Sequence, residues 1–198
     1  MKPIHTFLIT PKKERYDNIK KVNGTELILN SGITDHKFVS REAVIHETPI
    51  IDGKHFTRGT ELYVHHNIFR RWHDVRGIEK NSKSYFKDNL YFCELDQIFL
   101  YKHKGSWKAN QGYCFIKPLA SEDEFSTNKE KPLMGIVKHT DDSGLLTIGE
   151  KIGFTPDSEY EFIINGERLY RVMTKEISIK YEYKKEEREY NPSWVQGS

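Results

Sequence analysis

Cysteine is scarce in this chain, and long apolar runs are missing. The two cysteines, Cys93 and Cys114, each lie inside a short apolar run, and no Cys-x-x-Cys pair occurs. Two thiols cannot form a disulfide framework for 198 residues, so we expect buried, reduced thiols in a cytoplasmic protein. No apolar run approaches the roughly 20 residues of a membrane helix, and residues 1–5 lack the apolar core of a signal peptide. The sequence therefore predicts a soluble protein with no membrane partner.

Signs of catalysis and of strong charge are also missing. The formal net charge of +2 does not by itself indicate a nucleic-acid or membrane partner. No P-loop Gly-Lys-Ser/Thr occurs, and no Ser-His-Asp, Cys-His or paired-carboxylate constellation can be assembled. His65 and His66 are adjacent in an expected strand, so they point to opposite faces and are poorly placed to share a metal ion. We expect no enzyme activity, no cofactor and no metal.

The chain does contain short runs of β-branched and aromatic residues, separated by turn residues. Several runs alternate apolar and polar residues, as half-buried strands do, and no stretch keeps a 3.6-residue apolar period over twelve residues. This pattern predicts an all-β protein, with short strands typical of a barrel or a sandwich. The expected strands cover residues 6–10, 43–46, 61–65, 90–93, 97–101, 113–116, 135–138, 151–154, 159–164, 169–172 and 177–179.

The strand pattern occurs twice in the same order. Residues 7–11 match 114–118, 43–46 match 135–138, 58–64 match 148–154, and 90–93 match 169–172. The separation falls from 107 (114 − 7) to 92 (135 − 43), 90 (149 − 59) and 79 (169 − 90). Strands that keep their order while connections shorten are typical of duplicated domains, because loops tolerate length changes. The sequence predicts a first domain at 1–104, a second at 105–181 and a charged tail at 182–198.

One connection in the first copy is unusually long, at residues 12–41. A loop of about thirty residues in a compact domain is normally functional or disordered. Its start is charged and expected to be solvated, whereas its middle places Leu27, Ile28 and Leu29 between the turn-formers Gly24 and Asn30. The triplet is consistent with an exposed hairpin arm that binds a partner, and equally with an ordinary strand packed on its own barrel.

The first copy resembles the GroES-type co-chaperonin family from end to end. The second copy, residues 112–180, follows the same frame. The matching features are an opening strand at 2–9, a loop with Gly24 before the triplet, Arg41-Glu42-Ala43-Val44, a strand at 59–64, and an apolar strand with an acidic turn at 91–98.

The resemblance implies two tandem small GroES-like β-barrels with a mobile loop at 12–41 in the first. Gly24, Leu27, Ile28 and Leu29 would bind a GroEL-type chaperonin ring, and the insertion at 67–87 would form a roof hairpin. The protein would assemble as a ring-shaped homo-oligomer and assist client proteins indirectly, while the chaperonin binds and hydrolyses the ATP. The second copy's loop, at 120–134, has no aliphatic triplet after a glycine, so only the first would carry a working arm.

Two other features leave different functions open. Arg70, Arg71, Trp72 and Arg76 form a basic-aromatic cluster of the kind that binds single-stranded nucleic acid, a function that small barrels can have. A structural or viral assembly protein on the same fold is the third reading. In the charged tail, Trp194 and Val195 are a candidate apolar anchor on a neighbouring subunit.

Overall fold

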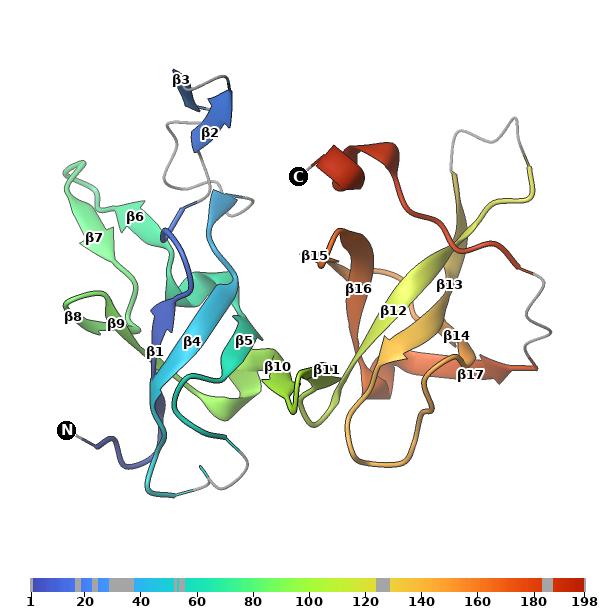
Figure 1. Cartoon of the computed structure of the whole chain (residues 1–198), viewed down its shortest axis with the longest axis horizontal. Coiled ribbons are helices and arrows are strands. Elements are labelled where there is room, and N and C mark those ends of the chain that lie inside the picture. The colour runs from blue at the N-terminus through green and yellow to red at the C-terminus, as the bar shows by residue number, and fades with distance from the viewer. Residues whose placement is uncertain are drawn as a thin grey trace. The chain divides into compact units, whose positions relative to one another are not determined.

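The computed structural model describes residues 2–16, 19–22, 25–28, 38–51, 53, 56–123, 129–182 and 187–197, with backbone only at 19–22, 25–28 and 196–197. Over these residues the secondary structure consists of β-strands and short 3-10 turns, without any α-helix. The prediction of an all-β protein is therefore confirmed. The chain divides into two compact units, unit 1 at residues 1–106 and unit 2 at residues 107–198 (Figure 1).

The strands are short, and most connections between them are turns. The first eleven strands are β1 (Phe7–Pro11), β2 (Ile19–Val22), β3 (Thr25–Ile28), β4 (Glu42–Glu47), β5 (Glu61–Val64), β6 (Arg71–His73), β7 (Glu79–Asn81), β8 (Tyr85–Lys87), β9 (Leu90–Cys93), β10 (Ile98–His103) and β11 (Ser106–Ala109). The others are β12 (Tyr113–Ala120), β13 (Glu130–His139), β14 (Lys151–Phe154), β15 (Tyr160–Ile164), β16 (Glu167–Met173) and β17 (Ile177–Tyr181). The 3-10 turns are η2 (His66–Ile68), η3 (Leu95–Gln97), η4 (Thr174–Glu176) and η5 (Ser193–Gly197).

The strands form two main sheets and two small ones. The seven-stranded sheet has the order β11-β10-β5-β4-β1-β9-β8, and the six-stranded sheet has the order β15-β16-β12-β13-β14-β17. β2 pairs only with β3, and β6 only with β7, among the described strands. The expected closed barrels are not seen: each main sheet ends in two different edge strands that do not pair with each other in the described part of the chain.

The two main sheets repeat one pairing scheme. In unit 1, β1 pairs with β4 and β9, and β5 pairs with β4 and β10. In unit 2, β12 pairs with β13 and β16, and β14 pairs with β13 and β17. The 3-10 turns η3 and η4 precede the last of these strands, β10 and β17, in the two copies.

The repeat extends to the individual residue pairs. In the β1–β4 register, Ile9 is paired with Ile45 and Pro11 with Ala43. In the β12–β13 register, Ile116 is paired with Val137 and Pro118 with Gly135. These pairs follow the offsets of 107 (116 − 9) and 92 (137 − 45) that the sequence predicts. The register also shifts at the same place, between Leu8 and Ile9 and between Phe115 and Ile116. The β4–β5 and β13–β14 pairs keep the offset of 90 (152 − 62), since Ala43 faces Leu62 and Gly135 faces Ile152.

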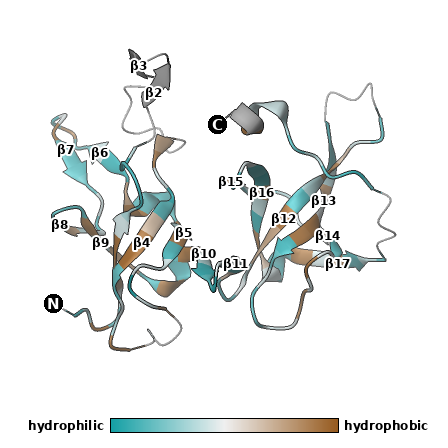
Figure 2. Ribbon diagram, in the orientation of Figure 1, coloured by the Kyte–Doolittle hydropathy of each residue, from teal (hydrophilic) through white to brown (hydrophobic). Residues whose placement is uncertain are grey.

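Each unit has its own apolar core, in which the inward residues of the repeated strands meet. The core of unit 1 includes Phe7, Ile9, Ala43, Ile45, Leu62, Val64, Tyr91, Cys93 and Ile98. The core of unit 2 includes Cys114, Ile116, Val137, Ile152, Phe154 and Val172. Apolar residues are accordingly concentrated on the central strands of each sheet (Figure 2). Because successive side chains of a strand point to opposite sides of the sheet, every second residue of these strands contributes to the core of its unit.

Candidate partner-binding surface

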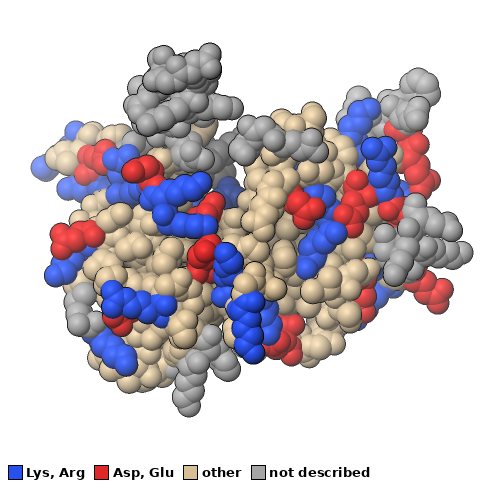
Figure 3. Space-filling model, in the orientation of Figure 1, with Lys and Arg blue, Asp and Glu red and all other residues tan. Residues whose placement is uncertain are grey.

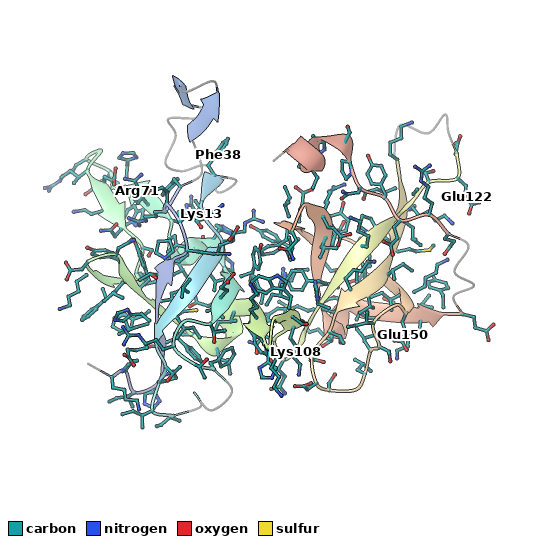
Figure 4. All side chains as sticks on the ribbon, in the orientation of Figure 1. Lys13, Phe38, Arg71, Lys108, Glu122 and Glu150 are labelled. Atoms are coloured by element: carbon teal, nitrogen blue, oxygen red, sulfur yellow. The ribbon has the colours of Figure 1, made fainter. Side chains whose placement is uncertain are left out.

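The long connection between β1 and β4 is closed at its root. Tyr16 and Val39 form an isolated antiparallel bridge, and the backbone N–H of Ser40 donates to the carbonyl of Arg15 at 3.0 Å. Both Tyr16 and Val39 are buried. The expectation that the start of this loop is solvated is therefore wrong for Tyr16, because its ring joins the core of unit 1. Lys13, Phe38 and Arg71, labelled in Figure 4, mark this end of the unit.

Beyond the root, the chain forms a two-stranded antiparallel ribbon from β2 and β3. Ile19 faces Ile28 and Lys20 faces Leu27 across it. The ribbon is a sheet of its own and is not part of the seven-stranded sheet. Of the predicted binding residues, Leu27 and Ile28 lie in β3, where only the backbone is described, whereas Gly24 and Leu29 fall outside the described residues. The backbone thus has the hairpin expected of an arm, and the environment of its side chains stays a prediction.

The insertion at 67–87 lies against the root of the loop. Arg15 donates through Nε to the carbonyl of Phe69 at 2.5 Å and through Nη2 to that of Arg70 at 3.2 Å. Its Nη1 donates to Oδ1 of Asn81 at 2.6 Å. Burial lowers the pKa of Arg15, whose guanidinium also lies 5.3 Å from the ring centre of Tyr91. A single side chain therefore joins the loop root to both ends of the β6–β7 hairpin.

A second contact joins the same two segments. The backbone N–H of Arg71 donates to the hydroxyl of Tyr16 at 2.7 Å, and the Arg71 guanidinium lies 4.7 Å from the centre of that ring. Arg71 also pairs with Glu79 across the hairpin at 2.8 Å. The β6–β7 hairpin, which lies in the insertion expected to form a roof, thus contacts the loop root at the end of unit 1 where the loop leaves the sheet. Its place in an assembled ring stays a prediction. Sequence reasoning missed Arg15 and Tyr16, whose contacts span more than fifty residues (69 − 15 = 54).

The basic-aromatic cluster predicted from sequence is only partly available to a ligand. Arg71 is engaged with Tyr16 and Glu79, and Trp72 donates its indole N–H to the carbonyl of Asn81 at 3.2 Å. The Nε atoms of Arg70 and Arg71 are buried. Arg76 is exposed at the hairpin turn. The four residues therefore do not form one continuous cationic surface.

The corresponding connection in unit 2 is built differently. Sequence reasoning extended this loop to Met134, but β13 already begins at Glu130, so residues 132–134 are strand residues. Leu133 packs against the core of unit 2 and cannot serve as an arm. The backbone N–H of Ser121 donates to the carbonyl of Lys129 at 2.9 Å and narrows the base of the remaining loop, of which residues 124–128 are not described.

The C-terminal tail belongs to unit 2. Glu189 bridges to Leu119, the N–H of Tyr190 donates to the carbonyl of Pro118 at 2.8 Å, and the N–H of Ala120 donates to that of Arg188 at 2.7 Å. The tail thus extends the sheet along β12. Val195 is fully buried within its own chain, which corrects its proposed role as an anchor on a neighbouring subunit. Trp194 remains about half exposed, at 54%.

Side chains in the tail fasten it to the strands of unit 2. Glu187 pairs with Lys131 at 2.6 Å and with Lys151 at 2.8 Å. Asn191 accepts a hydrogen bond from the buried ammonium of Lys117 at 2.8 Å and from the backbone N–H of Arg168 at 3.0 Å. Sequence reasoning treated this stretch as a separate tail, because its mixed charges carry no apolar period.

The described residues contain no group of three or more His, Cys, Asp or Glu side chains placed to hold a metal ion. The expectation that His65 and His66 point to opposite faces of a strand is wrong, because β5 ends at Val64 and the two rings stack with their centroids 4.6 Å apart. Nδ1 of His65 accepts a hydrogen bond from the backbone N–H of Asn67. Within the same residues, no helix is long and apolar enough to cross a membrane. Comparison of the sequence with protein-family models and with curated proteins gave no match in either case.

Proposed function

We propose that this protein is a co-chaperonin that caps a GroEL-type chaperonin ring and so assists the folding of client proteins. The observation that carries the proposal is the β2–β3 ribbon, which leaves the main sheet of unit 1 through a closed root. In this proposal the arm would carry Leu27, Ile28 and Leu29 to the ring, and its base is held by Tyr16 in the core of unit 1. Gly24, which precedes the triplet in the sequence, is assigned to the same arm by the resemblance.

The fold supports the proposal through its repeat. In this reading, the two main sheets are open variants of the GroES-type fold that diverged after a duplication. Each uses the same five-strand pairing scheme. Only unit 1 would carry an arm, because the second loop has no aliphatic triplet after a glycine, and Leu133 at its end packs on the core of unit 2. Unit 2 would then serve the assembly.

Energetics favour several arms acting together. Burying three aliphatic side chains in a partner groove yields on the order of 5 kcal/mol before costs. Ordering a flexible segment offsets much of that gain, so one arm alone binds weakly and reversibly. A ring-shaped homo-oligomer would multiply the effect through avidity. The chaperonin would bind and hydrolyse ATP, and this chain needs no cofactor.

Co-sedimentation with a chaperonin ring, with and without nucleotide, tests the proposal. The full chain should sediment with the nucleotide-loaded ring, and the variant Leu27→Ser/Ile28→Ser/Leu29→Ser should stay in the supernatant. A matched control is Leu145→Ser/Ile148→Ser, which removes two exposed aliphatic side chains from unit 2. If the triple variant binds the ring as well as the wild type does, the proposal that the arm binds the chaperonin is wrong. A stable oligomer that no ring retains would favour an assembly protein.

A nucleic-acid function receives less support from the same contacts. Arg71 is occupied by Tyr16 and Glu79, so the cluster offers fewer free cations than the sequence suggests. Binding to single-stranded nucleic acid would fall steeply with salt. The same preparations can be tested with a single-stranded oligonucleotide at two salt concentrations.

A further inference from the structure

The β6–β7 hairpin of unit 1 ends in a rigid turn. Oδ1 of Asp74 accepts hydrogen bonds from the backbone N–H groups of Arg76 and Ile78, both at 2.9 Å. The N–H of Asp74 donates to the carbonyl of Ile78 at 3.0 Å, and Gly77 supplies the positive φ of 74° that the turn needs. These bonds fix the backbone of the tip before any partner arrives.

The rigid tip exposes aliphatic side chains. Val75, at its outermost point, is fully exposed, and Ile78 is 50% exposed. Trp72, in β6, is 47% exposed, while its indole N–H is held by the carbonyl of Asn81. Three large apolar side chains on one small hairpin are costly to leave in water. A pre-organised apolar tip of this kind binds a partner with little further ordering cost.

The charge around the tip is positive. Residues 70–83 contain five Lys or Arg and two Asp or Glu, a net of +3 (5 − 2) with His neutral. In the space-filling view, Lys and Arg side chains gather where β6 and β7 lie in Figure 1 (Figure 3). A complementary surface is therefore apolar with carboxylates around it. An oligonucleotide fits less well, because Val75 and Ile78 offer neither a cation nor a ring for stacking.

The hairpin is fixed to the root of the binding loop. Arg15 holds Phe69, Arg70 and Asn81, and Tyr16 holds the backbone of Arg71. The tip therefore keeps a set orientation to the point where the arm leaves the sheet. A partner that binds the arm lies next to this hairpin.

We propose that the β6–β7 hairpin is a second docking element, which binds an acidic, apolar-lined surface on the chaperonin ring that the arm engages. The inference rests on the proposed function and adds a contact of fixed geometry to the contact made by the arm. The arm would make the first contact with the ring, and the hairpin would limit the orientations in which the protein binds to it.

Two variants test the two halves of this surface. Val75→Ser/Ile78→Ser removes the aliphatic tip, and Arg76→Glu/Lys83→Glu reverses two exposed charges. Each leaves the contacts of Arg15, Tyr16 and Arg71 in place, so the thermal unfolding of the chain should stay unchanged. Each should raise the Kd for the nucleotide-loaded ring about tenfold. The charge variant should also flatten the dependence of Kd on salt.

The outcomes separate this inference from the proposed function. Suppose that the wild-type chain, the Leu145→Ser/Ile148→Ser control and both hairpin variants bind the ring equally well. The hairpin is then not a docking element, and the proposed role of the arm is unaffected. If the wild-type chain does not bind any ring, both proposals fail. Loss of binding to a single-stranded oligonucleotide, with ring binding unchanged, would assign the hairpin to nucleic acid and overturn the inference.

Discussion

The hydroxyl of Tyr16 accepts a hydrogen bond from the backbone N–H of Arg71 at 2.7 Å, across 55 residues of sequence. The Tyr16 ring is buried in the core of unit 1, and the Arg71 guanidinium covers it. One tyrosine thus connects the core, the root of the long loop and the β6–β7 hairpin. The position of the candidate binding surface depends on this contact.

Removing that hydroxyl should loosen the hairpin. Tyr16→Phe leaves the N–H of Arg71 without its acceptor, so the free energy of unfolding should fall by about 1–2 kcal/mol. Amide hydrogen exchange over residues 69–81 should accelerate, while exchange in unit 2 stays unchanged. Tyr85→Phe, at an exposed ring in the same unit, is the control. Equal exchange in both variants would show that the hydroxyl does not hold the hairpin.

The attachment of the tail should depend on pH. Hydrogen bonds from Lys131 and Lys151 hold the pKa of Glu187 below its usual value. A depressed carboxyl pKa contributes stability above the unfolded value of about 4.3, and this is lost as pH falls through the folded pKa. Proteolysis of residues 187–197 should therefore speed up below about pH 4.

The variant Glu187→Gln isolates this contribution. It should show fast tail proteolysis already at neutral pH and little further change on acidification. His139 adds a second, independent loss of stability on acidification. Burial lowers the pKa of His139, so its protonation destabilises the fold as pH falls below about 6.5. This loss of stability should be the same in the wild type and in Glu187→Gln. Identical pH profiles for the variant and the wild type would contradict the role of Glu187.

Both thiols should be unreactive in the folded protein. Cys93 and Cys114 are free and fully buried. Burial raises the pKa of Cys93 and raises that of Cys114 to about 12, so neither forms the reactive thiolate near neutral pH. Alkylation with iodoacetamide, followed by peptide mass spectrometry, should label neither until denaturant is added. Rapid labelling of either in the native chain would show that its core is open.

The same experiment in a denaturant series reports on the two units separately, because Cys93 lies in unit 1 and Cys114 in unit 2. Alkylation of the two at different denaturant concentrations would show that the units unfold independently.

One pair of equivalent positions tests the repeat in detail. Pro118 faces Gly135 in unit 2 as Pro11 faces Ala43 in unit 1. A Cβ at Gly135 would lie 2.6 Å from the carbonyl oxygen of Lys117, so Gly135→Ala should destabilise unit 2 by about 1–3 kcal/mol. Ala43→Gly is the reverse change at the equivalent position and should cost about 1–2 kcal/mol, since it adds backbone freedom and removes a methyl group from the core of unit 1. A neutral Gly135→Ala would mean that the strands are less closely spaced than described.

Much of the fold is readable in the sequence because strand pairing follows local patterns. The offsets of the repeat hold residue by residue, since a slip by one position would turn Ile9 or Ile116 away from its core. The spacing of the expected strands also predicted the long loop, which contains the separate β2–β3 ribbon.

Long-range contacts could not be read in the same way. Arg15 and Tyr16 look like part of a charged loop start, and only the fold brings them against Phe69 and Arg71. Val195 similarly follows a polar tail, and its burial depends on the surface that unit 2 offers. Side-chain contacts between distant segments leave no period in the sequence.

The most direct test of the account follows the methyl groups of Leu27, Ile28 and Leu29 in the full-length protein by NMR. In the free protein they should give sharp signals of mobile methyls, and the addition of a nucleotide-loaded chaperonin ring should broaden them before those of core residues such as Ile45 and Val137. Rigid methyls already packed against the core of unit 1 in the free protein, or signals unaffected by the ring, would contradict the account.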